Sequence, residues 1–186
     1  MAKKIVFTKE QIHNKAYELF KINGLNKITA RELAKALQCS SAPIYASYLS
    51  MDELKDELIE RAKDSFIFYI KNNETEMALL NIGLGICKFA REEKQLFTTI
   101  FLRDVSYKDL ISEFHDIVKT EIYKDERFIE VDDELKETLL LDCWIYAHGL
   151  STLIVNNYFQ NPCDEFLKKR LLVAPTTWIY KAFNIK

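Results

Sequence analysis

The feature that most limits what this chain can fold into is its shortage of turn residues. It has four glycines and three prolines among 186 residues. All-β and doubly wound α/β folds need a turn about every dozen residues, and those turns depend on these two residue types. The chain is also 48% hydrophobic, so it can bury a sizeable core. The sequence therefore predicts an all-α protein.

Two segment-level observations narrow the class further. The amino-terminal run MAKKIVFTKE lacks the apolar core of a signal peptide, and no later segment approaches roughly 18 uninterrupted apolar residues. We therefore expect a cytoplasmic protein with no membrane partner. The cysteines lie too far apart for the CxxC spacing of a zinc or redox site, so we expect reduced thiols and no metal or cofactor. They are Cys39, Cys87, Cys143 and Cys163.

Charge is distributed unevenly along the chain. Residues 1–50 contain eight Lys or Arg and three Glu, a balance of +5, which leaves −7 for the remainder of a chain whose net charge is −2. Two interpretations fit this basic segment: a solvated charged face, or a surface for a polyanion.

The first third of the chain repeats one helix-start signal three times. In each copy a Ser or Thr is followed three residues later by Glu or Gln, the pattern of a capping box. The copies are Thr8–Gln11, Thr29–Glu32 and Ser50–Glu53. Apolar residues at helical spacing follow each signal, and Asn23-Gly24 is a stop for the first helix.

Residues 41–48 form a further, much shorter helix between the second and third signals. Pro43 falls in its first turn, where its missing N–H has no intrahelical partner, so the proline is compatible with a helix start. Ile44 and Tyr48, four residues apart, can pack inward, which leaves Tyr45 on the outer side. A two-turn helix with an exposed tyrosine is a poor core element.

A helix, a three-residue turn and a short second helix in a basic segment form the pattern of a helix-turn-helix, whose second helix lies in the DNA major groove. The run ITARELAKALQCSSAPIYASYLSMDEL resembles the amino-terminal domain of the TetR family of transcriptional repressors. The residues that match in register are Thr29, Leu33, Ala34, Ser40, Tyr45, Tyr48, Glu53 and Leu54. The detailed match covers about residues 8–55.

The resemblance implies a DNA-binding domain over residues 1–50 and a larger helical effector-binding and dimerisation domain over 51–186. It implies a palindromic double-stranded DNA operator, with Ser41, Ala42 and Pro43 near base edges and Thr29, Tyr45 and Tyr48 near the backbone. The full set expected at DNA is Lys27, Thr29, Ser40, Ser41, Ala42, Pro43, Tyr45, Ala46 and Tyr48.

Three positions depart from the family pattern. The turn glycine of the family is Gln38, a lysine usual before the next helix is Met51, and the histidine or arginine that often follows Tyr45 is Ala46. Gln38 would cost about 1 kcal/mol if the backbone there must be left-handed. The other two departures keep an alternative open, namely a helical dimeric protein-interaction module that has lost specific DNA binding.

The last two predicted helices, residues 133–158 and 164–183, each carry two apolar faces. One face of each can pack on its own domain, and the other predicts a second copy of the chain; the resemblance likewise implies a homodimer through these helices. Ala147-His148-Gly149-Leu150 resembles a segment common in the family, and Gly149 would let helices approach closely. The expected interface is Tyr146, Gly149, Leu150, Leu153, Leu167, Leu171, Ala174 and Trp178.

A central apolar helix, residues 77–90, is expected to be surrounded by side chains that resemble a small-molecule pocket, largely apolar with a few polar tips. They are Phe66, Cys87, Phe101, Tyr107, Phe114, Trp144 and His148. A filled core is the other interpretation, because residue types alone cannot distinguish a cavity from good packing. The effector implied by the resemblance is a small hydrophobic or amphipathic molecule.

No catalytic motif accompanies these features. The three histidines, His13, His115 and His148, lie outside any HExxH, and the chain has no GxSxG and no glycine-rich phosphate loop. Glu113 and Asp116 flank His115, but this spacing puts them on different helix faces and favours a solvated surface over a metal site. We therefore expect a protein that is not an enzyme.

Overall fold

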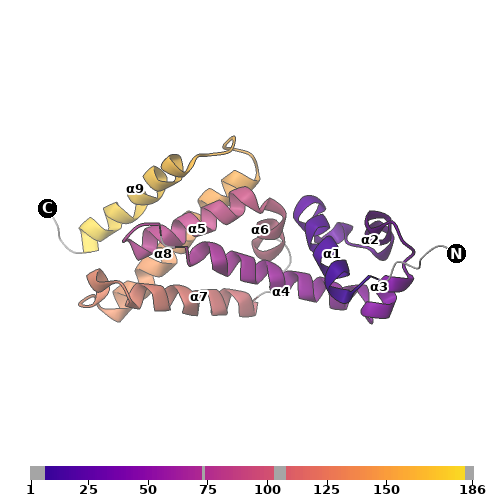
Figure 1. The fold of residues 1–186 in the computed structure, drawn as a ribbon. Helices are drawn as coiled ribbons and strands as arrows, with labels where there is room; N and C mark the ends of the chain where they lie inside the picture. Colours follow the sequence, from indigo (N-terminus) through magenta and orange to yellow (C-terminus); the bar gives the residue numbers. More distant parts are fainter. Residues whose placement is uncertain (1–6, 73, 103–107, 183–186) are drawn as a thin grey trace. The chain divides into compact units, whose positions relative to one another are not determined.

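A computed structural model of the chain describes residues 7–72, 74–102 and 108–182, with side chains for 7–72, 74–102 and 114–173. Every regular element in these residues is a helix, which confirms the all-α prediction (Figure 1). The elements are α1 (Lys9–Asn23), η1 (Leu25–Lys27), α2 (Ala30–Leu37), α3 (Ala42–Ser47), α4 (Met51–Ile70), α5 (Ala78–Glu92), α6 (Lys94–Phe101), α7 (Lys108–Tyr123), η2 (Glu126–Phe128), α8 (Asp133–Val155) and α9 (Asp164–Ala182).

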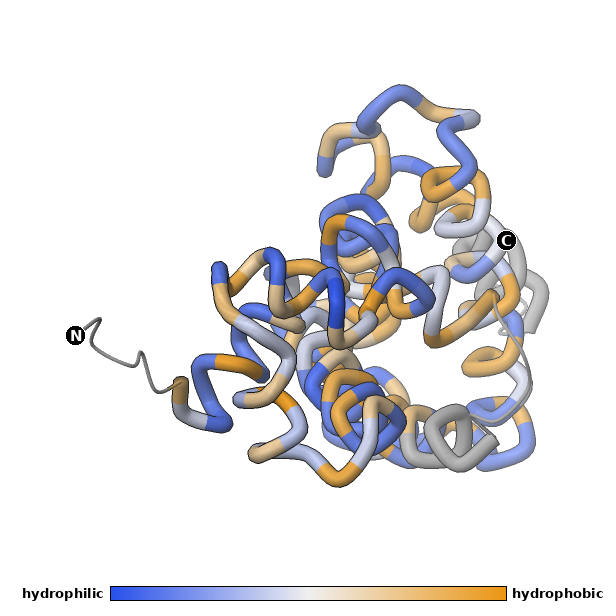
Figure 2. The backbone as a smooth tube through the Cα atoms, turned by 90° about the vertical axis from the view of Figure 1, so that its right-hand side faces the viewer, coloured by the Kyte–Doolittle hydropathy of each residue, from blue (hydrophilic) through white to orange (hydrophobic). Residues whose placement is uncertain are grey.

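The capping signals mark the helix starts as predicted. Thr8 and Gln11 form the reciprocal box at α1. The hydroxyl of Thr29 accepts the N–H of Glu32 at 3.2 Å, and the hydroxyl of Ser50 accepts the N–H of Glu53 at 3.1 Å. Along the helices hydrophobic residues recur between hydrophilic ones (Figure 2), as amphipathic helices require.

The chain divides into two compact units, Met1–Asp64 with Gln95–Arg103, and Ser65–Lys94 with Asp104–Lys186. The first unit is therefore larger than the predicted DNA-binding domain of residues 1–50, because it includes the first part of α4 and α6. Arg61 on α4 explains part of this difference, since its guanidinium donates to Asn14 at 2.6 Å and lies 4.1 Å from the ring centre of Tyr17, both on α1.

The first unit has a core contributed by α1 to α4 and α6. Ile12, Phe20, Leu33, Leu54 and Leu58 are fully buried. Gly24, after α1, has φ +80°, and a Cβ there would lie 2.7 Å from Oε1 of Gln95 on α6. Glycine at this position meets both the backbone geometry and the close approach.

The second unit is built around α5, which is buried on nearly every side, as predicted for residues 77–90. Helices α7, α8 and α9 pack against α5, and α8 also packs against α7 and α9. Gly85 permits a further close approach, because a Cβ there would lie 2.4 Å from the carbonyl oxygen of Tyr69 near the end of α4.

By length and composition alone, α8 is apolar enough to cross a membrane. In the structure it is a core helix, with Leu139, Leu140, Ala147 and Ile154 buried against its neighbours. Packing within the second unit thus accounts for part of its apolar composition.

Candidate nucleic-acid interface and ligand cavity

The turn between α2 and α3 closes on a left-handed residue. Gln38 has φ 55° and ψ 42°, and its N–H bonds back to the last turn of α2. The N–H of Cys39 also donates to the carbonyl of Ala34, at 3.0 Å. This is a helix-ending geometry usually taken by glycine, so the strained backbone expected for Gln38 is present.

The short helix α3 presents one exposed face outward and one buried apolar face inward. Ile44 is completely buried and Tyr48 is 2% exposed, whereas Tyr45 is 57% exposed. Ser41 precedes the helix and is exposed, as are Ala42 and Ala46, with Pro43 half-buried. The inward and outward faces predicted for residues 41–48 are confirmed.

A cleft in the first unit joins this outer face to α2 and to the start of α4. Its lining includes Thr29, Ser41 and Tyr45, together with three cations, Arg31, Lys35 and Lys55. Arg31 and Lys35 are four residues apart on α2, so helical spacing alone could have identified them as a pair. Lys55 lies on α4, and only the packing of α4 against the rest of the first unit brings it to the same cleft.

The remaining residues expected at DNA are placed differently from one another. Lys27, Thr29 and Ser40 are exposed. The hydroxyl of Tyr48 donates to Glu57 at 3.3 Å, Lys9 lies 4.6 Å from its ring centre, and burial raises its pKa. Tyr48 is therefore a core residue that holds α3 in place, as helical spacing predicts, whereas the family resemblance implied a position near the DNA backbone.

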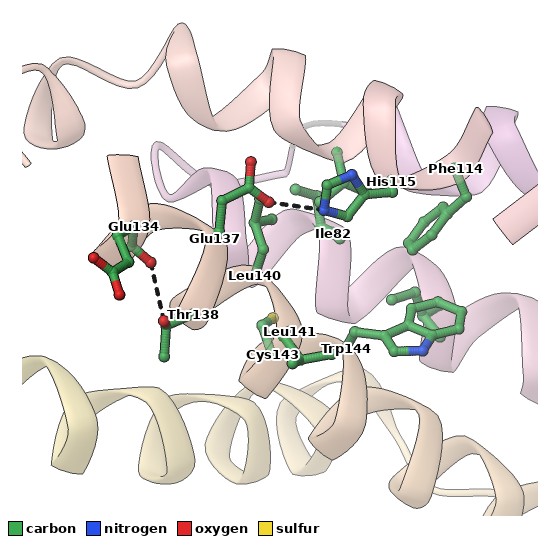
Figure 3. A pocket seen from close by; sticks show the side chains of 12 residues that line it. Ile82, Phe114, His115, Glu134, Glu137, Thr138, Leu140, Leu141, Cys143 and Trp144 are labelled. Carbon is green, nitrogen blue, oxygen red and sulfur yellow. Dashed lines mark hydrogen bonds and ion pairs between the residues drawn. The ribbon is translucent and has the colours of Figure 1, made fainter. Parts of the chain in front are cut away.

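A cavity of about 470 Å³ lies in the second unit, between α5, α7 and α8. Figure 3 shows the rings of Phe114 and Trp144 near one end of its lining and Glu134 and Thr138 toward the other. Its full lining is Ile82, Ile86, Phe114, His115, Val118, Glu134, Glu137, Thr138, Leu140, Leu141, Cys143 and Trp144. This arrangement of apolar walls with a few polar groups is typical of a small-molecule site.

Two of the seven residues predicted to line a pocket, Phe114 and Trp144, line this cavity. Phe66 is fully buried, and its ring centre lies 5.1 Å from that of Phe114. Phe101 is on α6, where it contacts Phe97. Tyr107 lies outside the described residues.

Cys87 and His148 also pack beside the cavity residues. The Cys87 thiol is buried, 3.6 Å from the hydroxyl of Ser151, and burial raises its pKa to about 12. His148 stacks against Trp144 with ring centres 5.2 Å apart, and its half-buried position lowers its pKa. Cys143, which does line the cavity, is a buried thiol whose pKa burial likewise raises to about 12.

Sequence reasoning missed the polar end of the cavity. His115 donates from Nε2 to one carboxylate oxygen of Glu137 at 2.9 Å, and the other oxygen of Glu137 pairs with Lys119 (Figure 3 shows the first contact). The hydrogen bond from Lys119 lowers the pKa of Glu137 and keeps it a carboxylate. His115 is exposed, as predicted for a solvated helix surface, and the packing of α7 on α8 brings it to Glu137.

The predicted dimer interface divides between core and surface. Leu150, Leu167 and Leu171 are buried in the second unit itself. Tyr146 is half-buried and Gly149 is exposed, and the side chains of Ala174 and Trp178 lie outside the described residues.

Helix α8 also has an exposed apolar face, which we call the α8 stripe. It consists of Leu141, Ile145, Gly149 and Leu153. Leu141 is 58% exposed, Ile145 59% and Leu153 42%. A Cβ added at Gly149 would meet no atom within 4 Å, so nothing in the described part of the chain covers the middle of this stripe.

Comparison with known proteins places this arrangement among solved folds. No family model matches the chain. The nucleoid occlusion factor SlmA of Haemophilus ducreyi is 24% identical over 170 residues, which span 82% of this chain and 83% of that protein.

Two solved structures align over almost the whole chain. The fatty acid degradation regulator FadR from Bacillus halodurans has a TM-score of 0.61 and 15% identity, covering 94% of this chain and 95% of that one. A TetR-like transcriptional regulator from Rhodococcus sp. RHA1 also has a TM-score of 0.61, with 13% identity and coverage of 92% and 95%. The resemblance inferred from residues 8–55 thus extends to the whole chain: it has the fold of the TetR-like transcriptional regulators.

Proposed function

We propose that this chain is a transcriptional regulator, and specifically a repressor, that acts in the cytoplasm as a homodimer on a palindromic operator. A small hydrophobic or amphipathic effector would release it from DNA. The observation that carries the proposal is the outer face of α3, where Ser41 and Tyr45 share one cleft with Arg31, Lys35 and Lys55. An exposed recognition helix beside cations is what groove binding requires.

These cations offset the departures from the family pattern. Met51 and Ala46 lack the charges usual at their positions, but Lys55 lies one turn after Met51 on α4 and lines the same cleft. Phosphate contacts by Arg31, Lys35 and Lys55 would give DNA binding that weakens as salt rises.

Homodimerisation is supported by the α8 stripe, which would otherwise leave three large apolar side chains in water. Helix α9 adds Leu172 and Val173, both exposed. A two-fold axis through this surface would bring two α3 helices to the two halves of a palindrome.

The cavity in the second unit supports the proposal that a small-molecule effector binds this chain. It lies against Phe114, which stacks on Phe66 of α4, and α4 is one continuous helix that begins with the Met51 turn beside the cleft. A ligand that binds one arrangement of this helix better than another would change DNA affinity.

The test is fluorescence anisotropy with DNA from the region flanking this chain's own gene. Tyr45→Ala should weaken binding severalfold without lowering the unfolding temperature, and Tyr158→Ala is the matched control, because Tyr158 is also exposed but lies in the second unit. Equal operator affinity for the wild type and Tyr45→Ala would contradict the proposed docking. Absence of any salt-dependent DNA binding would favour the protein-interaction module instead.

A further inference from the structure

The charged groups that line the cavity are unbalanced. Glu134, which is exposed, and Glu137 both line it, and no Lys or Arg is among its described lining residues. Both oxygens of Glu137 are engaged, one by His115 at 2.9 Å and the other by Lys119. Glu134 has no ion pair within the described part of the chain, so its negative charge is left for solvent or for a ligand.

The opposite end of the cavity is aromatic. The ring centres of Phe114 and Trp144 lie 4.5 Å apart, and Ile82, Ile86 and Leu140 complete an apolar wall. Figure 3 shows the rings of Phe114 and Trp144 at a distance from Glu134, with the His115–Glu137 pair between them. A molecule that fills the cavity would therefore have an apolar body and a polar end of defined charge.

We propose that the cavity takes an amphipathic cation, an apolar or aromatic body bearing one amine or quaternary ammonium group. The body would lie against Phe114 and Trp144, and the positive nitrogen would lie near Glu134. Attraction between the nitrogen and this carboxylate favours a cation. This inference specifies the effector class of the proposed regulator, and it depends on that function only for the consequence at DNA.

A ligand bearing a carboxylate fits this lining poorly. His115 is the one lining residue among those described that can carry a positive charge, and it already contacts Glu137. A ligand carboxylate would thus be the third in a site that already has two glutamates, where like charges cost binding energy.

The experiment uses three probes with one common body: phenylbutyltrimethylammonium, phenylbutanol and phenylbutyrate. Isothermal titration calorimetry of the full chain without DNA should give the cation about tenfold tighter binding than the alcohol, and the alcohol tighter binding than the carboxylate. Quenching of tryptophan fluorescence that is lost in Trp144→Phe would place the probe in the cavity. If phenylbutyrate binds tightest, or if none of the three binds at millimolar concentration, the proposal is wrong.

Glu134→Gln supplies the sharper test, because it removes the charge and keeps the shape. It should abolish most of the preference for the cation over phenylbutanol and leave phenylbutanol affinity unchanged. Glu165→Gln is the matched control, since Glu165 lies likewise in the first turn of a helix, α9, and does not line the cavity. Glu134→Lys should reverse the order and favour phenylbutyrate.

A purely structural role for Glu134 would give a different result. An acidic residue in the first turn of α8 stabilises that helix, so the Gln variant could lower the unfolding temperature. It would not change the ratio of the cation and alcohol affinities. A preserved ratio in Glu134→Gln would overturn the proposal, whereas failure to find an operator would overturn the proposed function and leave this result standing.

Discussion

Gln38 is the single residue at which the chain's departure from the family pattern has a visible structural cost. Its φ of 55° puts a side chain where glycine is usual. The three non-glycine residues with positive φ in the described chain are Gln38, Asn157 and Asn161. Asparagine tolerates this conformation better than glutamine does, because its short side chain can bond locally.

Gln38→Gly should therefore raise the free energy of unfolding by about 0.5–1 kcal/mol, the relief of the left-handed strain less the entropy that glycine loses on folding. The measurement is urea denaturation followed by circular dichroism. Asn161→Gly, at φ 48°, is the matched control and should gain less. A loss of stability in Gln38→Gly would show that the glutamine side chain makes a compensating contact.

Asp164, at the start of α9, forms ion pairs with two residues of α5. Its two oxygens accept from Arg91 at 2.6 Å and from Lys88 at 2.8 Å. The hydrogen bonds from Lys88 and then Arg91 lower the pKa of Asp164. A carboxyl group whose pKa is lower in the folded state stabilises the fold above its unfolded pKa of about 3.9, and this contribution is lost as the pH falls through the folded pKa.

Asp164→Asn should accordingly cost about 1 kcal/mol or less at pH 7, since the carboxylate is partly exposed and screened. The difference from the wild type should shrink below about pH 4. Urea midpoints at pH 7, 5 and 3.5 check this, with Glu165→Gln as a neighbouring surface change. If the stability difference between the wild type and Asp164→Asn stays constant down to the lowest pH, the shape of the Asp164 side chain, and not its charge, contributes the stability.

At the scale of the helices, the sequence predicted most of the fold because local signals agree with it. Thr8, Thr29 and Ser50 each cap a helix, and Pro43 begins one, so the starts could be found without tertiary information. The side of α8 that faces water could not be predicted from the sequence alone. Leu139, Leu140 and Leu141 are consecutive, and only packing against α5, α7 and α9 decides that Leu141 is the exposed one.

The same limit applies to the site. Outward Tyr45 and inward Ile44 follow from helical spacing, but Lys55 reaches the cleft through the packing of α4. In the second unit, Phe66 on α4 and Phe114 on α7 are the same residue type and lie next to each other. One fills the core and the other lines the cavity, because a cavity depends on where neighbouring side chains fail to meet, which composition does not specify.

The contact between α4 and α5 gives a prediction at this scale. Gly85→Ala should lower the free energy of unfolding by about 2–3 kcal/mol, because its Cβ would lie 2.4 Å from the Tyr69 carbonyl oxygen and 2.6 Å from the Ile70 Cα, both of them backbone atoms. Gly83→Ala on the same helix is the control. Its Cβ would meet a Leu171 methyl at 3.0 Å, which can move, so the cost should be below about 1 kcal/mol. Thermal unfolding of both variants compares them; equal losses would argue against a backbone clash.

For the whole molecule, assembly decides whether two α3 helices can act together. Ile145→Glu places a charge in the α8 stripe and should convert the proposed dimer to a monomer at micromolar concentration in sedimentation velocity. Ile129→Glu is the matched control, because Ile129 is 68% exposed and lies outside the stripe. If Ile145→Glu remains dimeric, the two copies meet through another surface.

Coupling between cavity and DNA is the final consequence at this scale. If phenylbutyltrimethylammonium lowers operator affinity tenfold, linkage requires that saturating operator lower the affinity of this probe tenfold, a coupling of about 1.4 kcal/mol. Titrating the probe into free protein and into the protein–operator complex measures both sides of the cycle. In Glu134→Gln, a given concentration of the probe should cause a smaller loss of operator affinity. The operator affinity measured without the probe should be unchanged, since Glu134 lies in the second unit. A probe that raises the unfolding temperature of the free protein yet leaves operator affinity unchanged would show that the cavity binds a ligand without being the switch.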